Sequence, residues 1–477
     1  MGKLGKIVLL AASALLLSGC LFRPPDELYT RPEKSAEYSQ LVSAIQAVRS
    51  ELETQYGVKT EDALIVSGDN TATIQLQDLD TEGGGVRESA LAFIRVPGAE
   101  KSLRIYIFTQ QGDDYRVSGI IQGDGSAIYS VDYTDLNGSG KQELVVNWQV
   151  SAGVYQLGAY TLDELDHPHG EEGQTADLLA TELLLTGCSG ASDSTGSYSS
   201  GYRLLDIDRD TRTEIAVVHM ESAGAGSMVE VYGWKDGAFV SMSTVGLSAG
   251  VVTLNRVRSN YLDGEYYPPA LYVTCTMPDS SRTVDVLTYR DGVLHNLSLG
   301  ENGVSENRLT GYIDVSMTDV NSDYVLEIPE LRPLPTLVEN VISSAYLVDW
   351  NRYNEAGDRS RVMTTYHNTT DGGYLVIPDE WLGKISVARN DTLSGQRQVV
   401  FSYWKGPDEN PEPFLSIYKL TGSNRTTRAT DSGRFVLREE AEVIYAARLY
   451  DCSWNSGLDE TALLDLFRTI QTNWSND

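Results

Sequence analysis

Nine residues, Asp206-Ile-Asp-Arg-Asp-Thr-Arg-Thr-Glu214, run directly into the apolar stretch Ile-Ala-Val-Val and decide how this chain folds. The same arrangement occurs at 135–143, Asp-Leu-Asn-Gly-Ser-Gly-Lys-Gln-Glu, and at 319–327, Asp-Val-Asn-Ser-Asp-Tyr-Val-Leu-Glu. A longer version starts at Asp78, and weaker echoes start at Asp263 and Asp391. An acidic turn that leads into an apolar run is typical of a loop between two β-strands.

The spacing of these loops indicates a repeat. Their first residues, at 78, 135, 206, 263, 319 and 391, lie 57, 71, 57, 56 and 72 residues apart. Further strand-like runs such as 229–234 and 284–289 follow, and Asp-Gly turns at 235–237 and 290–292 close two of them. Four short strands per repeat predict a mostly β fold, a β-propeller of about six blades, with seven possible.

The loops resemble the Asp-x-Asp-x-Asp-Gly-x-x-Asp motif of FG-GAP and VCBS-like repeats, the repeats of integrin α-subunit propellers. The resemblance covers about 78–405 and implies propeller blades with calcium-binding loops. The chain departs from the motif in several places. Gly140 alone keeps the sixth-position glycine, which Thr211 and Tyr324 replace, and the ninth residue is Glu instead of Asp. No clear Phe-Gly or Gly-Ala-Pro segment is present.

The residue types themselves suit calcium. Positions 1, 3 and 5 of a tight loop place their side chains on one concave side, and a carboxylate at position 9 closes the site. Calcium takes six to eight oxygen ligands in loose geometry. The candidate ligands, in order of expected affinity, are Asp206, Asp208, Asp210 and Glu214, then Asp319, Asn321, Asp323 and Glu327, then Asp135, Asn137, Ser139 and Glu143; the longer loop adds Asp78, Asp80, Glu82 and Glu88. The alternative is that these side chains only cap tight turns, without metal.

The N-terminus reads as an export signal. Lys3 and Lys6 precede an apolar run over 7–17, which is too short to span a bilayer. It ends in Leu-Ser-Gly-Cys20, which resembles the lipobox of bacterial lipoproteins. That resemblance implies cleavage before Cys20 and a diacylglycerol on its sulfur, so residues 1–19 form a signal peptide and 20–34 a lipidated tether. The alternative is an ordinary secretory peptide with an accidental cysteine.

The charge of the chain limits its partners. It has 37 Lys and Arg against 67 Asp and Glu, a net charge of −30. A surface of this sign repels phosphate backbones, which excludes nucleic acid as a partner, and it suits hard cations. Beyond Cys20 only Cys188, Cys275 and Cys452 remain. Three cysteines do not make a disulfide scaffold, although two of them could form one disulfide bond.

Two helices are expected beside the propeller domain of residues 62–455. In the first, over 35–56, apolar residues recur on one face: Leu41, Ile45, Val48 and Leu52. The second, over 456–473, begins with a capping signal at Ser456 and Asp459 and continues with an apolar stripe: Leu463, Phe467 and Ile470.

Catalytic motifs are weak, and we expect no enzyme. Gly246-Leu-Ser248-Ala-Gly250 matches the nucleophile elbow of α/β-hydrolases, but a strand-like run follows it where that motif needs a helix. A turn between strands explains its glycines. His167 and His169 lack further ligands in a recognisable pattern, which favours a polar loop.

The sequence therefore predicts a lipoprotein at the bacterial cell membrane, facing the extracytoplasmic side. Its propeller is interpreted as a binding or adhesion module for a protein or glycan ligand that the sequence does not identify. Two alternatives stay open. One is a calcium-dependent glycan hydrolase or lyase, and the other is a lipoprotein that assembles or senses other envelope components.

Overall fold

The computed structural model describes residues 36–66, 73–79, 88–112, 114–163, 178–192, 198–220, 226–264, 268–309, 315–335 and 345–470. The predicted signal peptide, Cys20 and the tether lie outside these residues. No described helix is both long enough and apolar enough to cross a membrane. The chain divides into two compact units: unit 1 is Met1–Leu64, Ala72–Asp124 and Leu162–Ala180, and unit 2 is Ile65–Thr71, Gly125–Thr161 and Thr181–Asp477. The predicted single domain over 62–455 therefore includes parts of both units.

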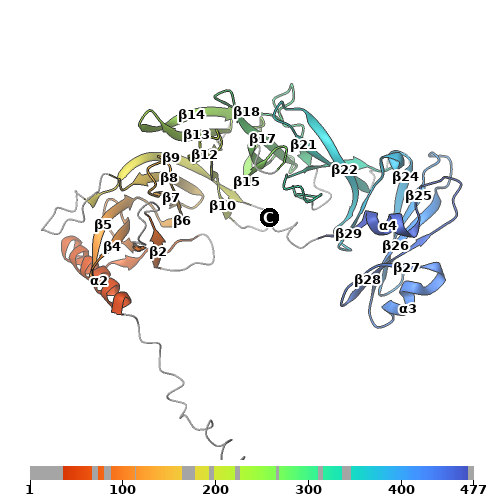
Figure 1. The fold of residues 1–477 in the computed structure, drawn as a ribbon, viewed down its shortest axis with the longest axis horizontal. Coiled ribbons are helices and arrows are strands. Elements are labelled where there is room, and N and C mark those ends of the chain that lie inside the picture. Colours follow the sequence, from red (N-terminus) through yellow and green to blue (C-terminus); the bar gives the residue numbers. More distant parts are fainter. Residues whose placement is uncertain are drawn as a thin grey trace, which may run out of the picture. The chain divides into compact units, whose positions relative to one another are not determined.

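Unit 1 is one antiparallel sheet with a helix packed against it (Figure 1). Its elements are α2 (Ala36–Tyr56), β1 (Glu61–Asp62), β2 (Ile74–Asp78), β3 (Glu88–Arg95), β4 (Leu103–Gln111) and β5 (Asp114–Gly123). Helix α2 occupies almost the same interval as the predicted helix, and Leu41, Ile45 and Leu52 are buried in a core shared with β3 and β4. One apolar face of α2 thus covers the sheet, as its periodicity indicates.

Unit 2 contains five further antiparallel sheets. The second sheet of the chain comprises β6 (Ala127–Thr134), β7 (Glu143–Ser151), β8 (Val154–Thr161), β9 (Thr181–Ser192) and β10 (Tyr198–Ser200); the third comprises β11 (Tyr202–Leu205), β12 (Glu214–His219), β13 (Met228–Lys235) and β14 (Ala238–Gly246). The fourth comprises β15 (Thr253–Tyr261), β16 (Pro269–Thr276), β17 (Arg282–Arg290), β18 (Val293–Asn296) and β19 (Arg308–Leu309).

The last two sheets follow the same plan. The fifth comprises β20 (Ile328–Pro333), β21 (Tyr346–Tyr353), β22 (Arg359–Asn368), β23 (Gly373–Val376) and β29 (Phe467–Thr469); the sixth comprises β24 (Ile385–Asn390), β25 (Gln396–Tyr403), β26 (Glu412–Thr421), β27 (Phe435–Glu439) and β28 (Val443–Leu449). Two short helices, α3 (Arg425–Thr430) and α4 (Glu460–Leu466), complete the unit. Strands adjacent in the chain pair in most places, so each sheet is chiefly a meander.

The turns and the core explain these sheets. Both predicted Asp-Gly hairpins form, and each has positive φ at its Asp and its Gly, the backbone that two-residue hairpins require. In β12 the side chains alternate between two cores. Ile215 and Val217 pack with the second sheet, while Ala216 and Val218 pack with the fourth. A strand buried on both faces reads as a continuous apolar run, which is the sequence that follows Glu214.

The mostly β prediction is confirmed, with six antiparallel sheets for the six acidic loops. A closed propeller is not seen among the described residues, so the number of blades stays a prediction.

The predicted C-terminal helix over 456–473 was too long. Asp459 caps α4 by accepting the Ala462 N–H at 2.8 Å, but the helix ends at Leu466. Phe467 begins β29, which pairs with β23 and buries the Phe467 ring between the fifth and sixth sheets. Tertiary packing of this ring outweighs the helical period of the apolar stripe.

Candidate metal centre

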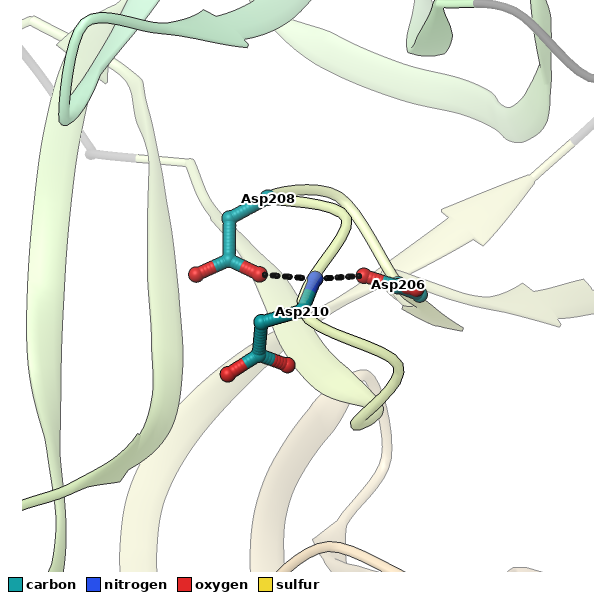
Figure 2. A group of neighbouring side chains, drawn as sticks. All are labelled: Asp206, Asp208 and Asp210. Carbon is teal, nitrogen blue, oxygen red and sulfur yellow. Dashed lines mark hydrogen bonds between the residues drawn. The ribbon is translucent and has the colours of Figure 1, made fainter.

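The acidic segment 206–214, called loop 206, joins β11 to β12 and folds around its own carboxylates. The two Asp206 oxygens accept the backbone N–H of Asp210 at 3.1 Å and of Thr211 at 3.0 Å. Asp208 also accepts the Asp210 N–H, at 3.1 Å (Figure 2). One oxygen from each of Asp206, Asp208 and Asp210 lies within 4.8 Å of the other two. The first, third and fifth side chains therefore face a common point.

Loops 135 (135–143) and 319 (319–327) repeat this arrangement. In all three loops, the Asp at position 1 accepts a hydrogen bond from the backbone N–H of position 6, and the side chain at position 3 accepts one from the N–H of position 5. The Glu at position 9 accepts one from the N–H of position 2. The residue before each loop is the cross-strand partner of its Glu: Thr134 with Glu143, Leu205 with Glu214, and Thr318 with Glu327. The loops are therefore structural equivalents in three different sheets.

Their backbones also match where their sequences differ. Positions 4 and 6 have φ between +66° and +80° in each loop: Gly138 and Gly140, Arg209 and Thr211, and Ser322 and Tyr324. A non-glycine residue in this left-handed region costs roughly 1–2 kcal/mol. The loss of the sixth-position glycine therefore leaves the loop conformation intact and adds strain to loops 206 and 319.

The ninth residue is a buried acid in all three loops. Glu143, Glu214 and Glu327 are each at most 1% exposed. Burial, followed by repulsion from Asp208, raises the pKa of Glu214 to about 8. Burial also raises the pKa of Glu327 to about 7, with repulsion from Asp323 and Asp319 adding to it. A bound proton or a nearby cation would stabilise each of these two buried carboxylates.

Loops 135 and 319 differ in whether Oε1 of this Glu has a hydrogen-bond partner. In loop 135, Glu143 Oε1 accepts the Asn137 amide at 2.9 Å and the Thr161 hydroxyl at 3.0 Å. In loop 319, Glu327 Oε1 is buried and has no hydrogen-bond partner within the described part of the chain. Oxygens of Asp319, Asp323 and Glu327 all lie within 4.8 Å of one another. Loop 319 thus combines a buried, unpartnered carboxylate oxygen with a cluster of three acids.

This donor set fits a calcium ion. Every candidate ligand is an oxygen, and the groups are charged, closely spaced and joined by a loop, as hard cations require. Two arginines contact the clusters: Arg212 Nε lies 3.2 Å from Asp210, and Arg352 Nη1 lies 3.1 Å from Asp323. Arg352 lies in β21, so no local pattern in the sequence could have predicted its contact with loop 319.

The structure describes only some of the remaining predicted calcium ligands. Asp78 and Glu88 are cross-strand partners in β2 and β3, but the Glu88 side chain, Asp80 and Glu82 lie outside the described residues. Asn321 accepts the Asp323 N–H at 3.1 Å, and Ser139 accepts the Lys141 N–H at 3.3 Å, as turn-capping side chains do. Within the described residues, loops 206 and 319 therefore hold the best-formed acidic clusters.

The serine of the Gly-x-Ser-x-Gly segment lies in a buried network. Ser248 is 1% exposed and donates to Asp285 Oδ1 at 2.8 Å, while its oxygen accepts the Ser305 N–H at 2.9 Å. Residues 253–261 continue as β15, so no helix follows it. An exposed nucleophile is absent at this position. Cys188, Cys275 and Cys452 are all free thiols, and His167 and His169 lie outside the described residues.

No protein-family model matches this chain, and no curated protein matches it. Among solved structures, a Bacillus licheniformis rhamnogalacturonan lyase PL11 is 14% identical with a TM-score of 0.29, over 61% of this chain and 62% of the lyase. The exotype rhamnogalacturonan lyase YesX is 13% identical with a TM-score of 0.30, over 66% and 63%. A hypothetical protein from Leishmania major is 9% identical with a TM-score of 0.21, over 66% and 92%. The match spans less than two thirds of either lyase, and likenesses of this size carry no argument about function.

Proposed function

We propose that this chain is a calcium-stabilised binding module, held by a lipid on Cys20 at the extracytoplasmic side of a bacterial membrane. The observation that carries the calcium part is the cluster of Asp319, Asp323 and Glu327, in which Glu327 also has a buried oxygen without a hydrogen-bond partner among the described residues. Loop 206 offers a second site with the same backbone. The six sheets are proposed to be the blades of a propeller.

Calcium in these loops would join neighbouring strands. Positions 1, 3 and 5 belong to the loop, whereas position 9 lies at the start of the next stretch of strand or at its bridge. An ion bound by both would hold the loop against the sheet and offset the strain of Thr211 and Tyr324. The consequence is a rigid set of loops, the usual place for ligand contacts on a β scaffold.

The binding role rests on the repeated acidic loops, and the charge of −30 limits the partners. Such a surface favours cations and disfavours nucleic acid. The ligand is proposed to be a protein or a glycan. The lipid anchor is tested separately: the wild-type protein should partition into detergent, and Cys20→Ser should remain in the aqueous phase.

Thermal unfolding tests the calcium sites. Calcium at a hundred times its dissociation constant should add about 2.7 kcal/mol per site, a shift of a few degrees against excess chelator. Asp208→Ala with Asp210→Ala, or Asp319→Ala with Asp323→Ala, should each reduce this shift. Asp408→Ala, an exposed aspartate outside these loops, is the control. An equal melting temperature with calcium and with chelator would mean that these side chains only cap tight turns and bind no calcium.

The enzymatic alternative, a calcium-dependent glycan hydrolase or lyase, predicts something different. Two of the similar solved structures carry the name of rhamnogalacturonan lyases, but at their TM-scores this is no support. Release of reducing ends from a panel of acidic and neutral polysaccharides, abolished by chelator, would favour the enzyme over the binding module. Crosslinking in cells separates the third possibility, an assembly or sensor lipoprotein, from a glycan binder.

A further inference from the structure

A second candidate site lies in unit 2, outside loops 135, 206 and 319. A cavity of about 30 Å³ opens between the fifth and sixth sheets. Its apolar lining comes from both sheets: Tyr366, Leu375, Val399, Phe401, Ile417 and Phe467. Phe401 and Leu375 are fully buried, so this end of the cavity is closed.

Rows of cross-strand partners on the two sheets line this cavity. On the fifth sheet, Tyr366, Leu375 and Phe467 are cross-strand partners. On the sixth, Val399 pairs with Ile417, and two residues along, Arg397 pairs with Lys419, which pairs with Tyr445. The Arg397 side chain is 46% exposed and Lys419 is half-buried, so these two cations lie at the mouth, beside the buried Tyr445. The cavity is therefore apolar inside and cationic at its opening.

The mouth has more positive than negative charge. Asp371 is buried there and binds Arg397 at 3.0 Å, Arg389 at 3.3 Å and the Asn368 amide at 2.6 Å. Arg389 also approaches Asp391, at 3.4 Å. One buried carboxylate thus serves two guanidinium groups and has its oxygens occupied.

Lys419 is the cation left over. Its side chain makes no hydrogen bond or ion pair within the part of the chain that the structure describes, although the residue is half-buried and lines the cavity. Its cross-strand partner is Arg397, and like charges directly opposite each other destabilise a sheet. Asp371 and Asp391 both act on Arg389 and Arg397, whereas the Lys419 side chain has no acid paired with it among the described residues. An anion bound between Arg397 and Lys419 would remove the conflict.

We propose that this cavity binds a carboxylate carried by a short aliphatic chain. The chain would enter between Val399, Ile417 and Phe467, and the carboxylate would accept hydrogen bonds from Lys419 and the free side of Arg397. A volume of 30 Å³ holds about two waters, hence about two or three carbon atoms, so a butyrate-sized acid matches it. This site is independent of the calcium loops, and neither proposal rests on the other.

The test is a titration of the full chain at constant ionic strength, with sodium butyrate as the probe. Butyrate should raise the melting temperature and show saturation transfer from protein to its methyl group, whereas 1-butanol and butylammonium should do neither. Lys419→Gln keeps the length of the side chain and should weaken butyrate binding about tenfold. Lys384→Gln, an exposed lysine just before β24, is the matched control and should bind as the wild type does.

A second variant tests the cavity itself. Val399→Leu adds one methylene at the apolar end and should shift the preference from butyrate towards acetate, while retaining Lys419. Equal responses to butyrate and 1-butanol would overturn the assignment of an anion site, and so would equal affinities of Lys419→Gln and Lys384→Gln. No response to butyrate at all would overturn the site.

Discussion

Glu327→Gln should change the stability of this protein in opposite directions with and without calcium. Glutamine has the same shape, and its carbonyl oxygen can still accept the Val320 N–H that Glu327 accepts at 2.9 Å. What it removes is the charge on a fully buried side chain whose other oxygen has no partner among the described residues. Without metal, this buried charge lowers the stability of the folded protein. With metal, the carboxylate is a ligand and stabilises it.

The magnitude follows from the pKa. Burial raises the pKa of Glu327 from 4.5 to about 7, so the folded protein holds this proton more tightly than the unfolded chain does. The folded state therefore loses stability as the pH rises from about 4.5 to about 7. The difference corresponds to about 3 kcal/mol, fully lost above pH 7. In chelator at pH 8, Glu327→Gln should recover up to this amount; at pH 4 it should have little effect.

Calorimetric melts at pH 4 and pH 8, in chelator and in excess calcium, measure the effect. Glu327→Gln should melt a few degrees above the wild type in chelator at pH 8, and below it in calcium at the same pH. Glu143→Gln is the control, because Glu143 already has the Asn137 and Thr161 donors; it should destabilise in both solutions. A Glu327→Gln effect of the same sign and size in both solutions would refute the reasoning.

Three further predictions concern the same loops and the buried serine. Thr211→Gly should stabilise the chelated protein by about 1 kcal/mol in chemical unfolding, because it relieves a left-handed β-branched residue (φ +75°); the same change at an extended position should destabilise. Asn137→Asp should lower the melting temperature in chelator and raise the calcium-induced shift, because it replaces the amide that donates to Glu143 with another acid. Ser248→Ala should destabilise by about 1–3 kcal/mol, since Asp285 loses a donor, and should leave any hydrolytic activity unchanged.

The acidic loops could be predicted from the sequence because their conformation is local. Nine consecutive residues contain both the Asp side chains and the N–H groups that they accept, so the spacing alone describes most of the hydrogen bonds in loop 206. The missing glycine at position 6 was one departure from the motif, yet Thr211 and Tyr324 adopt the same left-handed backbone as Gly140. The ladder that surrounds a loop can impose a strained residue that local preference alone would reject.

Features that depend on distant pairing were out of reach. Lys419 and Arg397 become neighbours only through the register of β25 and β26, and Arg352 reaches Asp323 from another strand. The C-terminal helix was predicted too long because Leu463 and Phe467 fit a helical period equally well whether or not the chain turns into a strand at Phe467. A periodic stripe identifies which side chains are buried, and it leaves open which element buries them.

The most direct test of the calcium proposal is an isothermal titration of calcium into the metal-free protein at pH 8. The two acidic clusters predict binding of about two ions, with Asp208→Ala plus Asp210→Ala removing one and Glu327→Gln weakening the other. At pH 7 the same titration should release protons, because the pKa of Glu214 is raised to about 8. The absence of saturable calcium binding, or binding that both variants leave unchanged, would contradict the account.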